Sequence, residues 1–181
     1  ANFSTIEISA SENPALTQQL KENFIESLDF NVGGFDQSQK YVQWATFEYA
    51  VFASKDVQVK NWVEKSVKGA KQLSDPEWGG VYQYSTDYDW EHLHFEKLLS
   101  IQARYTSIFL LNYFYSHDPS SFGFAKKTIE YADRFLLQPS GLYGNAQDAD
   151  LVQGEHAGAY FELNNEERLK LGIPKVDTNT F

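Results

Sequence analysis

The chain has 181 residues, which is long enough for a domain with a real hydrophobic core. Its formal net charge is -10 and its basic residues are scattered, so no basic face exists that would favour nucleic acid or an anionic membrane as a partner. The absence of cysteine excludes disulfides, thiol catalysis and thiolate metal sites. No apolar run reaches the roughly 18 residues of a membrane span. We expect a soluble protein, cytoplasmic rather than periplasmic or secreted.

Five helices of substantial length are predicted after a polar, weakly patterned segment over 1–11. The first begins where Asn13 can cap a helix and Pro14 can occupy its first position. The third and fifth carry one apolar stripe among charged residues, as outer helices do. The second and fourth are apolar over most of their circumference, which predicts inner helices with neighbours on several sides. The expected ranges are 14–28, 38–53, 56–73, 90–115 and 120–137.

Three glycine-rich loops that carry an aromatic residue follow these helices. Glycine permits the positive φ that ends a helix and lets the backbone approach a neighbour or a ligand closely. Such loops, together with alternating buried and amphipathic helices, are typical of a double-layered ring of helical hairpins. Plain helix-ending turns are the alternative interpretation. The loops are Gly33-Gly34-Phe35, Gly79-Gly80-Val81-Tyr82 and Gly141-Leu142-Tyr143-Gly144.

The last part of the chain predicts smaller elements. An extended stretch over 158–163 favours a short β-hairpin near residues 142–163. A brief helix should run from Asn164 or Asn165 to Gly172, and residues 176–181 form an unfinished tail. The expectation is therefore an all-α fold, a single partial toroid domain over 1–181 with its hairpins in 12–175. A closed ring needs about twice as many helices, so about half of it is expected here.

The densest polar stretch runs from Tyr82 to Lys97, between a glycine loop and the predicted start of the most buried helix. The positive end of a helix dipole favours carboxylates at this position. His92 and Glu96 would pair on one helix face, whereas His94 would point away, so the two histidines cannot share a metal. Because no His-Glu-x-x-His motif is present either, no metal and no other cofactor is expected.

A second acidic pair, Asp148 and Asp150, follows the third glycine loop. If the loops share one face of a ring, this pair and Asp87 with Asp89 converge on one cleft. Carboxylate pairs act as acid and base in sugar chemistry. In the alternative interpretation these aspartates only cap helices or hold turns. The candidate catalytic residues are His94, favoured as the base, and Glu96, Asp87, Asp148 and Asp150.

Aromatic and amide side chains next to these carboxylates suit a sugar ring, which has apolar faces and hydroxyl edges. Many of the aromatic residues will simply fill the core. The candidate ligand-binding residues are Tyr82, Gln83, Tyr84, Asp89, Trp90, Tyr143 and Gln147.

The central motif resembles a known family. The stretch from Gly79 to Trp90, followed by His94-Phe95-Glu96-Lys97-Leu98-Leu99 and Gln102-Ala103, resembles the Gly-Gly-Phe-x-Arg-Tyr-Ser-x-Asp-x-x-Trp…His-Phe-Glu-Lys-Met-Leu signature of the thioredoxin-domain-containing family of the YyaL and spermatogenesis-associated protein 20 type. Asp148-Ala149-Asp150 and Gly158-x-Tyr160 are similar to two further elements of that family.

The resemblance covers about Phe30 to Gly172 and implies an (α/α)6 toroid similar to N-acylglucosamine 2-epimerases and six-hairpin glycosidases. The family's thioredoxin part and its cysteine pair are absent from this sequence, so no redox activity is carried over. Gln83 replaces the usual arginine and Leu93 the usual proline, which leaves the catalytic role of this loop open.

The function expected from these residues is that of a carbohydrate-binding or carbohydrate-active protein, epimerase- or isomerase-like, with its reaction open. One alternative is a non-catalytic protein-interaction module. Another is an inverting glycoside hydrolase, which needs two carboxyl groups roughly 6.5–9.5 Å apart. The expected partners are a sugar-like small molecule and, for the protein itself, the remaining half of a toroid or a second copy.

Overall fold

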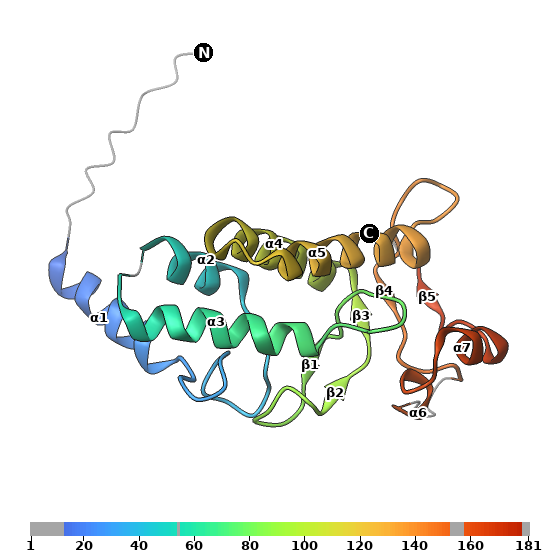
Figure 1. Cartoon of the computed structure of the whole chain (residues 1–181), viewed down its shortest axis with the longest axis horizontal. Coiled ribbons are helices and arrows are strands. Elements are labelled where there is room, and N and C mark those ends of the chain that lie inside the picture. The colour runs from blue at the N-terminus through green and yellow to red at the C-terminus, as the bar shows by residue number, and fades with distance from the viewer. Residues whose placement is uncertain (1–12, 54, 153–157, 179–181) are drawn as a thin grey trace, which may run out of the picture.

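The computed structural model describes residues 13–53, 55–152 and 158–178, and Figure 1 shows their arrangement. The predicted polar segment over 1–11 lies outside the described residues. Helices carry most of this fold, as predicted. They are α1 (Pro14–Glu26), α2 (Trp44–Ala53), α3 (Val57–Gln72), α4 (Leu99–Ser116), α5 (Pro119–Tyr131), the π-helical turn η1 (Ala132–Leu136), α6 (Gly158–Phe161) and α7 (Asn165–Leu171). The strands are β1 (Tyr84–Ser85), β2 (Leu93–His94), β3 (Lys97–Leu98), β4 (Ala146–Gln147) and β5 (Val176–Asp177).

Side-chain caps fix where several helices begin. The Asn13 side chain accepts a hydrogen bond of 3.1 Å from the Leu16 amide, and Asp56 caps α3 in a similar way. Asn164 begins α7 with a complete capping box, in which the Glu167 carboxylate accepts from the Asn164 amide. These bonds satisfy amides that have no partner inside the helix. The predicted first, third and last short helices are confirmed.

The predicted fifth helix is confirmed as well, but it ends in a π-helical turn instead of an α-helical one. Asp118 caps α5 and Pro119 occupies its first position. In η1 the Leu137 amide donates to the Ala132 carbonyl, five residues back, so the last turn is a π-helix. Phe135 in this turn is buried in the core.

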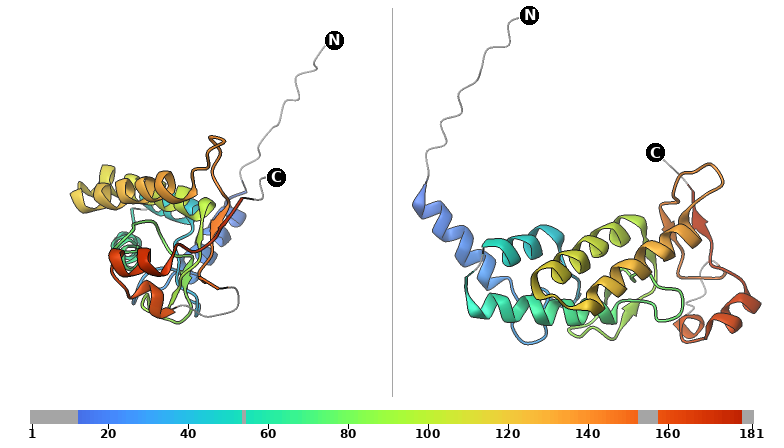
Figure 2. Two further views of the ribbon diagram at one scale, coloured as in Figure 1. Left: turned by 90° about the vertical axis from the view of Figure 1, so that its right-hand side faces the viewer. Right: turned by 45° about the horizontal axis from the view of Figure 1, so that its top comes forward.

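α4 is the central helix of the bundle. It contacts α2, α3 and α5, and Figure 2 shows these helices side by side along the long axis of the molecule. Its buried face joins apolar residues to Gln102 and Asn112, whose amide groups are hydrogen-bonded. Buried polar groups need such partners because desolvation without them is costly. The main core around α4 includes Leu28, Phe47, Trp62, Leu73, Trp90, Tyr105, Ile108 and Phe109.

A second, smaller core lies where α6, α7 and the short strands gather (Figure 1). Aromatic rings dominate it. Trp78 stacks on Phe135 with 4.6 Å between ring centroids, and Phe95 stacks on Phe161 at 4.8 Å. Aromatic pairs of this kind contribute roughly 0.5–1.5 kcal/mol beyond the area that they bury. This core therefore ties the loop before β1, the end of α5 and α6 together.

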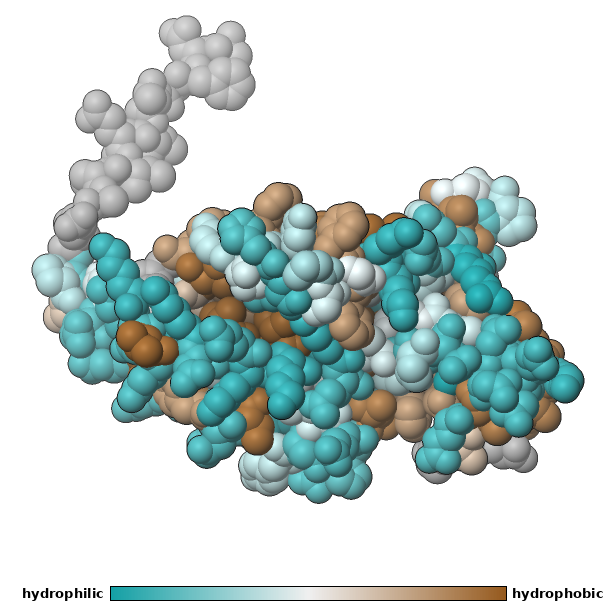
Figure 3. Space-filling view, viewed as in Figure 1, coloured by the Kyte–Doolittle hydropathy of each residue, from teal (hydrophilic) through white to brown (hydrophobic). Residues whose placement is uncertain are grey.

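The prediction that the second and fourth helices are buried on several sides is wrong in part. On α2, Phe47 is buried but Phe52 is 59% exposed, and Phe114 and Tyr115 at the end of α4 are 67% and 52% exposed. Phe52 and Tyr115 meet edge to face, and apolar side chains reach the surface over this helical half of the molecule (Figure 3). Even so, no helix among the described residues combines the length and apolar character needed to cross a membrane.

Two predicted helix starts are wrong. The second helix begins at Trp44 rather than near Ser38, because Lys40 forms a β-bridge with Ser85 instead. The fourth begins at Leu99 rather than near Trp90, because the intervening chain forms β2, which pairs with β1, and β3, which pairs with β4. In both cases a pairing with distant residues overrides the local helical pattern.

The strands form two small antiparallel sheets, β1-β2 and β3-β4-β5. The predicted hairpin near 142–163 is confirmed only as β4, because its partners β3 and β5 lie outside that range. The stretch expected to be extended there contains the helical turn α6. The tail, which had no predicted pattern, contributes β5, and its residues 179–181 lie outside the described part.

Candidate functional site

Two loops, residues 29–34 and 75–80, share one backbone geometry and are called here the first and second Asp-Gly-Gly loops. In each, Oδ1 of the leading aspartate accepts hydrogen bonds from the amides two and three residues later. The aspartate amide donates to the carbonyl of the second glycine, and the first glycine amide donates to the aspartate carbonyl. All four glycines have φ between 69° and 82°, which other residues adopt only with strain. The Asp-x-x-x-Gly-Gly spacing is therefore a structural repeat.

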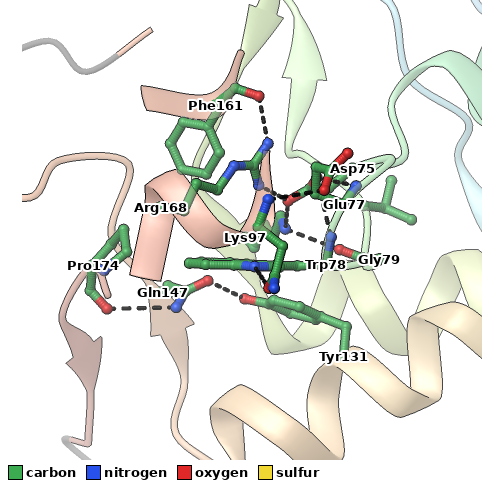
Figure 4. A network of polar contacts seen from close by, with 12 residues as sticks. Asp75, Glu77, Trp78, Gly79, Lys97, Tyr131, Gln147, Phe161, Arg168 and Pro174 are labelled. Carbon is green, nitrogen blue, oxygen red and sulfur yellow. Dashed lines mark hydrogen bonds and ion pairs between the residues drawn. The ribbon is translucent and has the colours of Figure 1, made fainter. Parts of the chain in front are cut away.

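A buried lysine neutralises the aspartate of each loop. Lys40 Nζ lies 2.6 Å from Asp29 Oδ2, and Lys97 Nζ lies 2.7 Å from Asp75 Oδ2. Each lysine also donates to a backbone carbonyl at its loop. The second loop has an additional cation, because Arg168 from α7 donates to Asp75 Oδ2 at 2.7 Å (Figure 4).

Asp75, Lys97 and Arg168, with the neighbouring Tyr82 and Tyr131, are called here the Asp75 cluster. Burial and the neighbouring opposite charge shift the pKa of Asp75 in opposite directions, and the same holds for the pKa of Lys97. Burial alone would raise the pKa of Asp75, but Lys97 and Arg168 hold that pKa below its usual value. Burial lowers the pKa of Lys97 to about 8, although Asp75 favours its charged form. Burial also raises the pKa of Tyr82 and Tyr131, whose ring centroids lie 5.0 and 4.3 Å from Lys97 Nζ.

The titration of Lys97 predicts a pH dependence of stability. Its pKa falls from 10.5 to about 8 in the fold, so between these values the folded state binds fewer protons than the unfolded state. Stability should therefore rise with pH in this window, by at most about 1.4 kcal/mol per pH unit. The buried tyrosines oppose this rise above roughly pH 10, because their raised pKa keeps protons on the folded state.

Urea unfolding at a series of pH values checks this prediction. The free energy of unfolding of the wild type relative to Lys97→Met should increase from about pH 8 to about pH 9.5. A difference between the two proteins that is constant or falls with pH would contradict it.

The segment before α4 does not place its polar residues as predicted. β1 pairs with β2, which sets Tyr84 opposite His94, and the predicted helical pair of His92 with Glu96 is wrong. His92 Nδ1 instead lies 2.9 Å from the Asp89 carboxylate. That hydrogen bond raises the pKa of His92.

His94 and Glu96, two predicted catalytic residues, lie together at the surface. The His94 ring stacks on Tyr84 with centroids 4.8 Å apart and an angle of 8° between the planes. His94 Nε2 lies 3.7 Å from Glu96 Oε2, and the two side chains are 41% and 36% exposed. The imidazole is thus supported by an aromatic face and has a carboxylate nearby, while solvent and small molecules reach both groups.

An open hollow of about 380 Å³, called here the strand hollow, lies beside the three-stranded sheet. Successive side chains of a strand point to opposite faces. Lys97 and Gln147, which are register partners, are each 1% exposed, whereas their neighbours Glu96 and Asp148 line the hollow. The full lining is Glu96, Leu98, Asn145, Ala146, Asp148, Lys175 and Asp177.

The other side of this sheet is held by the Asp75 cluster. Gln147 Oε1 accepts a hydrogen bond of 2.9 Å from the buried Tyr131 hydroxyl, and its amide nitrogen donates to the Pro174 carbonyl (Figure 4). Lys97 belongs to the same strand pair and to the cluster. The two sides of the sheet therefore differ: one carries buried, hydrogen-bonded polar side chains, and the other faces the open strand hollow.

The chemistry of the strand hollow is that of a hydroxyl-binding site. Carboxylates accept from hydroxyl groups, an ammonium donates to them, and an amide does both. Within the described ranges, no three histidine, aspartate or glutamate side chains are placed so that they could hold a metal ion.

The two acidic pairs do not line one hollow, contrary to the expected convergence. Asp89 lies in a second hollow of about 310 Å³ whose lining includes Lys65 and Trp90. Asp148 lies instead with Glu96 in the strand hollow, and the Asp150 amide donates to its Oδ1 at 3.1 Å.

The remaining predicted residues are placed apart from the strand hollow lining. Tyr82, Trp90 and Gln147 are at most 4% exposed; the two aromatic residues pack in the cores, and the Gln147 side chain is hydrogen-bonded to Tyr131 and Pro174. Asp87 and Tyr143 are exposed. The Asp87 side chain accepts a hydrogen bond from the Tyr88 backbone amide, and the Tyr143 hydroxyl donates to Asp133. The backbone amide of Gln83 donates to the His94 carbonyl.

Sequence reasoning missed five residues that build this region. Asp75 could have been found from the repeated Asp-x-x-x-Gly-Gly spacing, since both loops carry it. No local signal marks Arg168, Lys175 or Asp177, because their partners lie far away along the chain. Asn145 directly precedes the predicted Gln147-Asp148 stretch but does not stand out within it.

Comparison with known proteins adds relatives to this geometry. No family model matches the chain. It is 28% identical to spermatogenesis-associated protein 20 of Mus musculus over 151 residues, which is 78% of this chain. The identity to the Homo sapiens protein is also 28%, over 84% of this chain. The chain is thus similar to spermatogenesis-associated protein 20 over most of its own length. It spans about a fifth of the length of these curated relatives, which it matches over 18% and 20% of theirs.

Two solved structures share the fold of this chain. A sugar epimerase from a ruminal bacterium superposes with a TM-score of 0.56 at 19% identity, covering 78% of this chain and 42% of that one. A family 76 glycoside hydrolase from a bovine Bacteroides thetaiotaomicron strain gives a TM-score of 0.62 at 14% identity, covering 94% and 36%. The predicted helical-toroid fold, which these two solved structures share, is confirmed.

Proposed function

We propose that the strand hollow binds a sugar-like ligand. The observation that carries this proposal is that Glu96 and Asp148, which come from distant segments, line one open hollow. Asn145 and Lys175 add hydrogen-bond donors to the same lining. A sugar needs such a mixture because each of its hydroxyl groups both donates and accepts. The names of the two structural neighbours, a sugar epimerase and a glycoside hydrolase, agree with a carbohydrate ligand.

The proposed chemistry is proton transfer of the epimerase or isomerase kind. His94 is the candidate base, because its ring is held by Tyr84 and its Nε2 lies 3.7 Å from Glu96. Asp148, which lines the strand hollow with Glu96, would then bind hydroxyl groups or return the proton. Inverting hydrolysis of a glycoside is the alternative use of the same Glu96 and Asp148 pair.

Calorimetric titration with neutral hexoses and N-acetylated hexosamines tests the proposal. Glu96→Gln and Asp148→Asn should each weaken binding by roughly ten- to a hundred-fold, because each removes a charged hydrogen-bond acceptor of the ligand. The matched control is Glu130→Gln on the exposed face of α5, which should bind like the wild type. Absence of binding across the panel, or equal binding by all four proteins, would refute the sugar site.

A second candidate function, protein interaction, is favoured by the exposed aromatic residues of α2 and α4. Phe52, Phe114 and Tyr115 are more than half exposed, and together they offer an apolar surface to a neighbouring helix. The partner would be a further helical hairpin of a toroid or a second copy of this chain. Light scattering over a range of concentrations detects the second of these directly.

A further inference from the structure

The two Asp-Gly-Gly loops differ in one respect that points to a role for Arg168. In the first loop Lys40 is the single cation among the described residues that bonds to the aspartate. In the second loop Lys97 occupies the corresponding position, and Arg168 is added to the same carboxylate oxygen. Because the loop geometry is the same with one cation or two, the extra cation is not required to form the loop. We therefore expect Arg168 to stabilise the position of the segment that carries it rather than the loop itself.

Arg168 fastens that segment to the second loop. Its side chain is 0% exposed, its Nη1 donates to Asp75, and its Nε and Nη2 donate to the Leu163 and Phe161 carbonyls (Figure 4). The guanidinium group also lies over the Trp78 ring, 5.2 Å from the centroid. One planar group thus joins the loop, α6 and α7, which uses the several donors that arginine offers in fixed directions.

The start of α7 adds two bonds to the same loop. The Asn165 amide donates to Glu77 at 2.9 Å, and the Trp78 indole nitrogen donates to the Asn165 side chain at 2.9 Å. α7 is thereby attached to residues 75–80 at both its first turn and its centre.

From α7 the chain continues directly into one wall of the strand hollow. β5 follows α7; Lys175, directly before β5, and Asp177 within it belong to the lining. The Asp148 amide donates to the Lys175 carbonyl and the Asn145 amide to the Asp177 carbonyl, each at 2.8 Å. Residues 158–178, called here the strap, therefore connect the Asp75 cluster to the hollow.

We propose that Arg168 is a positioning residue for the strand hollow: by fixing the strap to Asp75 it sets where Lys175 and Asp177 stand relative to Glu96 and Asp148. The ligand part of this inference rests on the proposed function. The structural part does not, since it concerns how β5 is held on β4. Loss of Arg168 should weaken the attachment of the strap to β4, while Lys97 keeps its bond to Asp75 and the second loop keeps its conformation.

The test compares Arg168→Met with Arg168→Lys and with Lys40→Met, which removes the cation of the first loop. Amide hydrogen exchange without ligand should be at least about ten-fold faster at Asn145 and Asp148 in Arg168→Met, and partly restored in Arg168→Lys. The amides of Glu77 and Trp78, which are held by Asp75, should stay protected. In Lys40→Met the Asn145 and Asp148 amides should exchange as in the wild type.

Fluorine NMR of 5-fluorotryptophan protein gives a second signature. The Trp78 resonance should move in Arg168→Met, while Trp62 and Trp90, whose indole nitrogens donate to carbonyls of the first loop, should move only in Lys40→Met. Sugar affinity should fall about ten-fold in Arg168→Met.

Unchanged exchange at Asn145 and Asp148 in Arg168→Met overturns the proposal, and so does simultaneous loss of protection at Glu77 and Trp78. Should Arg168→Met not fold, Arg168→Lys decides by the same exchange measurement. If the wild type binds no sugar, the proposed function fails, whereas the exchange data still judge Arg168 alone.

Discussion

Replacing Asp75 by asparagine is expected to lower the free energy of unfolding by about 3–5 kcal/mol, because two cations would remain buried without their carboxylate. Lys97 and Arg168 both bond to Asp75 Oδ2 at 2.7 Å, and their side chains are 1% and 0% exposed. Asparagine keeps an oxygen for the loop amides but has no charge to offset either cation. Urea unfolding followed by circular dichroism at neutral pH measures the loss.

Asp29→Asn is the matched control for this variant. Asp29 holds the first loop by the same backbone bonds but neutralises one lysine, and its side chain is 10% exposed. Its loss should therefore be clearly smaller than that of Asp75→Asn. Equal losses would show that leaving the second buried cation without a carboxylate costs no additional stability, and would contradict this expectation.

Gly69→Ala is expected to destabilise the protein by about 2–3 kcal/mol, because the added methyl group overpacks the core. A Cβ atom at Gly69 would lie 2.1 Å from Cε2 of Trp90, which is 4% exposed and donates from its indole nitrogen to the Val32 carbonyl. The indole ring would have to leave its site. Helix propensity alone predicts the opposite sign, a gain of about 1 kcal/mol.

Gly123→Ala isolates the propensity effect. Gly123 lies within α5, and no atom stands within 4 Å of a Cβ atom built there. Thermal and urea unfolding should show a gain of about 0.5–1 kcal/mol for this variant. If both alanine variants stabilise the protein, the contact of Trp90 with α3 does not constrain the helix.

Local chemistry was enough to predict the helices that have strong caps. Asn13-Pro14 and Asp56 mark the starts of α1 and α3 in the sequence, and the structure confirms both. These signals act within one turn of helix, so they do not depend on the rest of the fold. The family resemblance then supplied the toroid.

The errors came from residues whose partners are distant. Asp87 and Asp89 look like helix caps, yet they stand in the loop between β1 and β2, whose pairing is two residues long on each side. A strand of two residues is too short to show the alternation of apolar and polar residues by which strands are predicted. Arg168 was missed because only the folded chain brings it to Asp75.

The candidate site was predicted in part for the same reason. Glu96 and Asp148 were singled out by their motifs, and the structure brings these two together. Lys175 and Asp177 complete the hollow at β5. This strand pairs with β4 although α6 and α7 lie between the two strands in the chain, so no local pattern predicts the pairing. Whether these residues act on a ligand stays a prediction.

The most direct test of the sugar site is a titration of ¹⁵N-labelled protein with neutral hexoses and N-acetylated hexosamines, followed by amide chemical shifts. Saturable shifts should concentrate at Asn145, Asp148 and Lys175 of the strand hollow, and amides around the second hollow, such as Lys65, should stay in place. Shifts confined to the second hollow, or none with any sugar, would contradict the proposal that the strand hollow is the ligand site.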